Sequence, residues 1–221
     1  MSVTIGTGNS AVFEANLEGT PRHSEQLLDL IAEGLKRLGL KKHDLDALVW
    51  GLGPGSFTGL RIGLSVLKGF CLGLKKPSFG VSSLDAIALG SGLVSGNLMV
   101  CLDARREHIY AAQYRFEKGR VKKILSDSIL SLDQFMTKAK AGTTLTGDAL
   151  LSYAELIRKK KGQSVSFLSP YFWYPRARFI LKLWEEKREW LEVLSLRKMT
   201  PRYLRASEAE EKWNQKKRGH K

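Results

Sequence analysis

The first 40 residues change from the apolar spacing of strands to that of a helix. Alternate residues are apolar in the runs 3–5 and 11–15, on either side of a turn at residues 6–9, and predict a β-hairpin over residues 2–18. A stripe with three- and four-residue spacing then predicts a helix over residues 23–38, which Gly39 ends. The members of this stripe are Leu27, Leu28, Ile31, Leu35 and Leu38.

Residues 45–90 predict an α/β unit. A strand over 47–52 is followed by a glycine-rich turn, an apolar helix to about residue 74 and a strand over 78–81. A further helix, to about residue 90, opens at Ser82-Ser83-Leu84-Asp85. We expect Ser82 to cap this helix and Asp85 to complete a capping box.

A Gly/Ser-rich stretch over residues 90–97 predicts the boundary between two units. The second unit also begins with strands, and helices alternate with strands after them, so the pattern predicts an α/β fold with antiparallel strands. The expected strands are 98–103, 109–116, 121–125 and 143–146, and the expected helices are 132–140, 149–160 and a basic amphipathic helix over 176–190.

The helix that ends near residue 74 carries an unusual number of glycines. Two glycine pairs, Gly59/Gly63 and Gly69/Gly73, are each four residues apart, and each glycine costs a helix about 1 kcal/mol relative to alanine. Close approach of another backbone is the usual compensation. The other residues are apolar on nearly every side, which predicts a buried helix. Because Arg61 and Lys68 interrupt it, we do not expect a membrane span.

The turn before this helix is a candidate phosphate-binding loop. Gly53, Gly55, Ser56 and Thr58 lie between a strand and a helix N-terminus, where free backbone N–H groups and the helix dipole favour an anion. The spacing matches neither the dinucleotide fingerprint nor the P-loop, since no lysine lies in the turn. A tight turn before a closely packed helix is the simpler interpretation.

The charge of the chain is strongly positive and uneven. The net charge is +14 over 221 residues, and residues 101–221 supply most of it through clusters at residues 158–161, 176–188 and 212–221. Such a field attracts polyanions, RNA in particular. Basic helix faces that are merely solvated explain it equally well. We expect the last residues, 206–221, to be a disordered tail.

Composition and the remaining motifs favour a reduced, cytoplasmic protein. Cys71 and Cys101 lie in apolar sequence and form neither a C-x-x-C pair nor a metal spacing. No basic segment precedes the first apolar run, so a signal peptide is not expected. Ser56 lies outside any nucleophile-elbow pattern, and a hydrolase is therefore not indicated by the residues.

Several motifs together resemble the bacterial TsaB (YeaZ) family. The resemblance is strong from about residue 20 to 115 and returns near the C-terminus. The motifs, in chain order, are Arg22-His23-Ser24-Glu25, the stretch from Gly53 to Gly63, Lys68-Gly69, the stretch from Gly80 to Ala86, Leu102-Asp103-Ala104-Arg105-Arg106, Tyr110-Ala111-Ala112, Thr146-Gly147-Asp148 and the stretch from Pro201 to Glu210.

The resemblance implies two ribonuclease-H-like lobes of the actin/Hsp70-type fold, in a Gcp-like (glycoprotease-like) branch. The expected division is an N-terminal lobe over 1–95 and a C-terminal lobe over 96–205. Family members open on an Asp-Thr-Ser strand, whereas this chain opens on what resembles the second strand, at Ser2-Val3. We therefore expect the first strand of lobe one to be missing, with unpaired backbone on the strands beside it; a misassigned start is the alternative.

The resemblance also implies a role in making threonylcarbamoyladenosine beside the tRNA anticodon. The implied role is a non-catalytic scaffold that binds and activates the TsaD catalytic subunit, joined by the ATPase TsaE. tRNA is then bound through the complex, and the isolated chain forms a homodimer through its first two helices. The expected interface residues are Leu27, Leu28, Ile31, Leu35, Gly59, Gly63, Leu64, Leu67 and Phe70.

The catalytic relatives hold a metal with a His-x-x-x-His pair on the first helix, but this chain has Leu27 four residues after His23. No metal and no tightly held cofactor are expected, and weak binding of ATP or ADP stays open. Asp103 beside Arg105 and Arg106 fits a local ion pair better than a catalytic acid. Two other functions stay open: a degenerate metal- or nucleotide-dependent enzyme, and a basic RNA-binding module.

Overall fold

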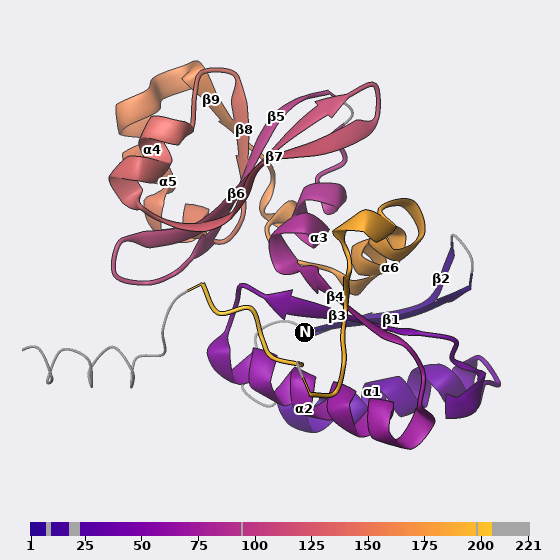
Figure 1. Ribbon diagram of the computed structural model, residues 1–221. Coiled ribbons are helices and arrows are strands. Elements are labelled where there is room, and N and C mark those ends of the chain that lie inside the picture. Colours follow the sequence, from indigo (N-terminus) through magenta and orange to yellow (C-terminus); the bar gives the residue numbers. More distant parts are fainter. Residues whose placement is uncertain (8–9, 18–22, 94, 198, 205–221) are drawn as a thin grey trace, which may run out of the picture.

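Two lobes lie one above the other in the computed structural model (Figure 1). It describes residues 1–7, 10–17, 23–93, 95–197 and 199–204, with the backbone alone for 23–25. Lobe one contains most of the first 90 residues, and lobe two contains the five-stranded sheet that follows. The two-lobed α/β architecture expected from the sequence is confirmed.

Lobe one is a layer of strands between two layers of helices (Figure 1). Its N-terminal elements are β1 (Ser2–Thr7), β2 (Ser10–Asn16), α1 (His23–Arg37), β3 (Leu48–Gly53), α2 (Phe57–Leu74), β4 (Ser78–Ser82) and α3 (Ser83–Gly90). The Ser56 hydroxyl caps α2 by accepting the N–H of Gly59 at 3.3 Å, and Lys75, at φ 54°, ends the helix. Short 3₁₀ turns lie at Lys42–Asp44, Gly162–Ser164, Pro170–Phe172 and Arg188–Trp190.

Lobe two is built on one continuous mixed sheet with the strand order β7-β6-β5-β8-β9. β5, β6 and β7 form an antiparallel meander, and β8 and β9 run parallel to β5. The elements are β5 (Gly96–Asp103), β6 (His108–Glu117), β7 (Arg120–Ser131), α4 (Leu132–Lys138), β8 (Thr143–Thr146), α5 (Ala149–Lys161) and β9 (Val165–Phe167).

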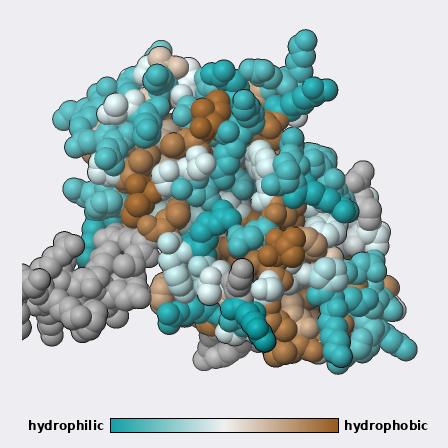
Figure 2. Space-filling view, viewed as in Figure 1, coloured by the Kyte–Doolittle hydropathy of each residue, from teal (hydrophilic) through white to brown (hydrophobic). Residues whose placement is uncertain are grey.

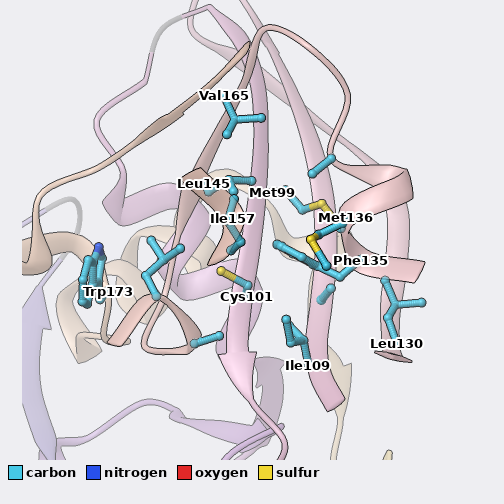
Figure 3. Packing of buried hydrophobic residues seen from close by; sticks show 14 residues of the cluster. Met99, Cys101, Ile109, Leu130, Phe135, Met136, Leu145, Ile157, Val165 and Trp173 are labelled. Atoms are coloured by element: carbon cyan, nitrogen blue, oxygen red, sulfur yellow. The ribbon is translucent and has the colours of Figure 1, made fainter. Parts of the chain in front are cut away.

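Both faces of this sheet are buried. On one face, α4 and α5 cover a core that includes Phe135, Leu145 and Ile157, each fully buried (Figure 3). On the other face, α3 of lobe one contributes Leu84 and Ile87 to a second core. A helix of lobe one therefore closes the core of lobe two, and the lobes are joined by packing rather than by a linker alone.

The C-terminal part of the chain returns to lobe one. α6 (Ala177–Glu186) packs on β1, β2, β3 and α3, and β10 (Glu192–Val193) pairs antiparallel with β4. The expected assignment of residues 96–205 to one C-terminal lobe is corrected: the lobe-two sheet ends at β9, and residues 177–204 complete lobe one. Apolar residues of α6, with Leu183 fully buried, need a second sheet face to cover, and lobe one supplies it.

The strands of lobe one form two separate sheets. β1 pairs with β2, and β3 pairs with β4, which pairs with β10. Within the described residues no strand pairs with both β1 and β3. Helices still cover both groups: α1 packs on β1 and β2, α2 packs on β3, and α6 lies across β1 and β3.

Most predicted elements are confirmed, with β7 longer and the last helix shorter than expected. β9 and β10 were not predicted, because strands of three and two residues carry no readable period. The capping-box role of Asp85 is wrong. Ser82 does cap α3, accepting the N–H of Leu84 at 3.1 Å, but the Asp85 carboxylate is buried and bonds to Tyr114 and Lys123 instead. The expected tail, 206–221, lies outside the described residues.

Candidate functional site: the outer face of the first two helices

α1 and α2 lie side by side beneath the lobe-one strands (Figure 1). Five of the expected interface residues point inward and are buried within the chain itself: Leu27, Leu35, Gly63, Leu64 and Leu67. The remaining apolar ones reach the surface, since Ile31 and Phe70 are partly buried and the Leu28 side chain is 53% exposed. The burial pattern divides the expected set into a half that anchors the helices and a half that a partner could contact.

Gly63 belongs to the anchoring half. A Cβ atom placed on it would lie 2.7 Å from Cζ2 of Trp50 and 2.9 Å from its Nε1. The close approach that the glycine spacing indicates is therefore, at this position, an approach to the indole of β3. A larger residue at Gly63 would disrupt the packing of α2 on its own sheet before it affected any partner.

A second stripe of small and apolar residues runs along the outside of α2. Its alternating spacing of three and four residues places its members on one face of a helix. Cβ atoms on Gly69 and Gly73 would meet no heavy atom within 4 Å. The stripe consists of Gly59, Ile62, Val66, Gly69 and Gly73, none of which is buried. The sequence pattern paired Gly59 with Gly63 and Gly69 with Gly73, each four residues apart, and did not reveal the alternating three- and four-residue spacing of the stripe.

Hydrophobic and hydrophilic atoms both lie at the surface over α2 (Figure 2). α2 is, among the described residues, the one helix long and apolar enough to cross a membrane by length and composition, with 28% of it buried. Its inner residues Leu64, Leu67 and Cys71 pack on Leu52 and Leu194, as a helix covering a sheet does. Its outer stripe and Leu72, which is 66% exposed, carry an apolar surface that the described chain leaves uncovered.

The candidate phosphate loop lies between β3 and α2. Gly53 has φ 105°, and a Cβ there would lie 2.8 Å from Cδ1 of Leu60, so this position requires glycine. Gly55 is open on its Cβ side, and Thr58 is exposed. Ser56 is used as the helix cap. Phosphate binding by this loop stays a prediction, while the tight-turn interpretation has a geometric basis.

A C-terminal segment lies across the start of α2. The Arg202 N–H donates to the Leu52 carbonyl at 2.9 Å, and the Tyr203 ring stacks on Phe57 with centroids 4.8 Å apart. Nε of Arg61 donates to the Tyr203 hydroxyl at 3.1 Å. This segment and α2 enclose a hollow of about 310 Å³, lined by Arg61, Leu64, Ser65, Lys68, Met199, Thr200, Pro201 and Tyr203.

A buried ionic network joins the lobes. Nζ of Lys123 lies 2.6 Å from a carboxylate oxygen of Asp85 on α3 and 2.6 Å from one of Asp127 on β7. The Tyr114 hydroxyl donates to Asp85 at 2.7 Å, and Arg202 pairs with Asp127 at 3.2 Å. Burial raises the pKa of Asp85, although Lys123 and Tyr114 oppose the shift, and burial raises the pKa of Tyr114 well above its usual value. These groups bond to one another, which is typical of a structural network.

Asp103 and Asp148 meet where β5 and β8 end. The Asp103 N–H donates to Oδ1 of Asp148 at 2.9 Å, and Arg105 pairs with Asp103 at 3.2 Å, which confirms the expected ion pair. Burial raises the pKa of Asp148. A Cβ on Gly147 would lie 1.9 Å from the Cys101 carbonyl oxygen, so the Thr-Gly-Asp motif needs its glycine for the close contact of β5 with the turn before α5.

The described residues contain no group of three or more His, Cys, Asp or Glu side chains that could hold a metal ion. His108 contacts the Arg106 carbonyl through Nδ1 at 2.7 Å, and His43 is exposed. The side chain of His23 lies outside what the structure describes, so the expectation about a metal at the first helix stays untested.

Comparisons with known proteins agree on one family. The sequence model of the family described as TsaD, tRNA N6-adenosine threonylcarbamoyltransferase, matches residues 18–171. The chain is similar to proteins named tRNA threonylcarbamoyladenosine biosynthesis protein TsaB from several bacteria. The one from Haemophilus influenzae is 27% identical over 83% of this chain and 80% of its own length, and the one from Bacillus subtilis is 28% identical over 86% and 83%. The match to the Escherichia coli protein is 33% identical and spans 53% of this chain and 52% of that protein.

Two solved structures have a similar fold. One is described as an uncharacterized protein with similarity to peptidase YEAZ from Pseudomonas aeruginosa; it has a TM-score of 0.73 and 24% identity and covers 92% of this chain and 94% of that one. The other is YeaZ from Pseudomonas aeruginosa, with a TM-score of 0.71 and 21% identity over 92% and 93%. At these identities the likeness concerns the fold.

Proposed function

The chain belongs to the TsaB (YeaZ) family of TsaD-like, Gcp-type proteins, and its relatives are named for tRNA threonylcarbamoyladenosine biosynthesis. From this premise, we propose that it is a non-catalytic subunit that binds and activates a TsaD-type catalytic subunit. In this role it supports transfer of a threonylcarbamoyl group to the adenosine next to the tRNA anticodon. A TsaE-type ATPase joins the pair, and tRNA is bound through the complex in the cytoplasm.

The observation that carries the proposal is the outer stripe of α2. The partly buried Ile62 and Val66 share one face of α2 with Gly59, Gly69 and Gly73 at heptad-like spacing. Such a face suits close packing of another helix, because glycine lets two backbones approach. The neighbouring helix α1 has an exposed Leu28 and a partly buried Ile31. Two helices from each partner would form a four-helix interface, and about 1,600 Å² of total buried area is enough for a stable one.

The polar groups favour a structural role for the chain over a catalytic one. Asp85, Lys123 and Asp127 satisfy one another in the interior, and Asp103 is paired with Arg105. Ser56, the serine of the glycine loop, is used as a helix cap. The proposal therefore assigns this chain no nucleophile, no acid–base pair and no tightly held cofactor.

A single substitution on the outer stripe tests the role. Gly69→Leu adds bulk where a Cβ atom would meet nothing within 4 Å beyond the adjoining backbone of its own helix, so the chain should fold while helix–helix contact is blocked. We expect native mass spectrometry to show loss of both the homodimer and the complex with the TsaD-type subunit. Threonylcarbamoyladenosine formation by the reconstituted enzymes should fall to the level seen without this chain.

Two matched variants control for size and hydrophobicity. Gly69→Ala keeps the surface nearly flat and should retain binding, and Ser65→Leu adds the same apolar bulk to an exposed site of α2 outside the stripe. If folded Gly69→Leu protein still binds the catalytic subunit and supports full modification, the stripe is not the interface. If the wild-type chain has no effect on modification at all, the proposed function itself is wrong.

A further inference from the structure

One end of lobe two gathers basic residues from two helices. α5 ends in the run Arg158–Lys161 and leads into β9, and α4 ends at Lys138 and leads, through Lys140, into β8. β8 and β9 start together, because Thr143 pairs with Val165 and the Gly142 N–H donates to the Ser164 carbonyl at 2.7 Å. The ends of both helices therefore lie at the same edge of the sheet, which we call the basic end: Lys138, Lys140, Arg158, Lys159, Lys160 and Lys161.

Few acidic groups balance this charge. Lys160 pairs with Asp133 at 3.3 Å, with both side chains largely exposed, and such a pair contributes little. Lys159 and Lys161 form no ion pair within the described part of the chain, and a hydrophilic surface covers α4 and the adjoining part of α5 (Figure 2). One or two cations at a helix C-terminus complement its dipole. Four in succession, with two more beside them, exceed what the dipole explains.

A hollow lies next to the basic end, and Arg158 is the basic-end residue that lines it. The hollow has a volume of about 430 Å³ and is lined by Arg158, Gly162, Gln163, Val165 and Phe167. The Arg158 guanidinium lies over the Phe167 ring, 5.0 Å from its centroid, and so presents a planar cation to the hollow. Gln163 is exposed and carries both a donor and an acceptor.

We propose that the basic end is an RNA-docking surface, in which the lysines contact phosphates and the hollow receives an unpaired base. Lysine ammonium groups bind phosphates as point charges, and a guanidinium plane next to an aromatic ring provides a stacking surface for a base. The Gln163 amide can bond to the edge of that base. The identity of the RNA as the tRNA that the complex modifies rests on the proposed function. An acidic peptide added to the open edge of β9 would use the lysines without needing the planar stack or the amide, so RNA fits more of the site.

The lysines are tested by comparing two variants that each lose three positive charges, one at the basic end and one elsewhere on the same lobe. In the full-length chain, K159Q/K160Q/K161Q is compared with K118Q/R120Q/K122Q, which removes three exposed cations from the β6–β7 turn and the start of β7 in the same lobe. The probe is a transcript of a tRNA that reads codons beginning with A, titrated between 50 and 300 mM salt. Each lost phosphate contact should flatten the dependence of log K on log salt by about 0.7–0.9, and affinity at 150 mM should fall roughly 10- to 100-fold. The control should change it less than about threefold.

The hollow is tested by comparing the binding of single-stranded RNA, whose bases are unpaired, with the binding of duplex RNA. Gln163→Ala leaves the charge unchanged and should weaken binding of the transcript and of a single-stranded oligonucleotide several-fold, while binding of a blunt RNA duplex is unaffected. Equal effects of the two triple variants on RNA binding would overturn the proposal. The proposal would also be overturned if binding of a poly-glutamate peptide depended on Lys159–Lys161 while binding of RNA did not. An unchanged preference of Gln163→Ala for single-stranded RNA would show that the hollow does not bind a base. If modification requires this chain but the K159Q/K160Q/K161Q protein binds tRNA normally, the RNA surface is wrong and the proposed function stands.

Discussion

The two lobes handle their apolar residues in opposite ways. Lobe two has one continuous sheet with both faces covered, and many of its core side chains have no exposure at all. Lobe one has its strands in two separate sheets, and the helix α2 leaves an apolar stripe and Leu72 at the surface. The same chain thus contains a lobe whose sheet is covered on both faces and a lobe whose outer helix has apolar residues at the surface.

This difference indicates which lobe contributes most to folding stability and which lobe would contribute to association with a partner. A closed core makes lobe two the stable part, because burial of apolar area is the main favourable term in folding. The apolar residues at the surface of lobe one are the basis of the proposed association, because exposed apolar patches often mark an interface. Substitutions in the two lobes should therefore separate unfolding from loss of binding.

The largest effect is expected from truncating the core of lobe two. Phe135→Ala removes a fully buried ring from α4 and should lower the free energy of unfolding by about 3–5 kcal/mol. Leu28→Ala, at an exposed position of α1, should change that free energy by less than about 0.5 kcal/mol and weaken subunit association instead. Urea denaturation and native mass spectrometry on both proteins measure the two quantities. Comparable destabilisation by the two substitutions would contradict the contrast between the lobes.

A smaller effect is expected from the ionic network that joins the lobes. Lys123→Met keeps the aliphatic stem but leaves Asp85 and Asp127 without their shared cation, and we expect a loss of about 2 kcal/mol. Because Asp85 belongs to lobe one and Lys123 to lobe two, the loss should lower the cooperativity between the lobes, seen as two transitions in calorimetry. Lys122→Met, at the exposed neighbouring position, is the control and should leave a single transition.

The smallest effect is a pH dependence at Asp148. Burial raises the pKa of this carboxyl in the folded chain above its value in the unfolded chain. The folded state then binds the proton more tightly, so this group's contribution to stability is greatest at low pH and is lost as pH rises from the unfolded pKa through the raised folded pKa. Asp148→Asn, which retains an acceptor for the Asp103 N–H, should therefore gain stability relative to the wild-type chain as the pH rises from 4 to 7. A difference that is constant or decreases over this range would contradict the assignment.

The candidate site could be predicted only in part. The helix stripe identified α1 and α2 as the relevant elements, but it could not separate inward from outward residues. Gly63 lies four residues from Gly59 in the sequence pattern, yet Gly63 faces the Trp50 indole and Gly59 is exposed. Periodicity states which residues share a face, and the neighbouring sheet decides which face is the buried one.

Local sequence by itself determined the helices, the longer strands and the caps at Ser56 and Ser82, because these depend on contacts within a few residues. The basic run at residues 158–161 and the glycine loop are likewise plain in the sequence. Only the tertiary structure decided that α6 and β10 return to lobe one, that Asp85 joins Tyr114 and Lys123 across the lobes, and that Arg158 of the basic run lines a hollow. The reason is physical: such arrangements depend on which of several residues distant in sequence covers a given apolar face. A local sequence pattern does not contain that information.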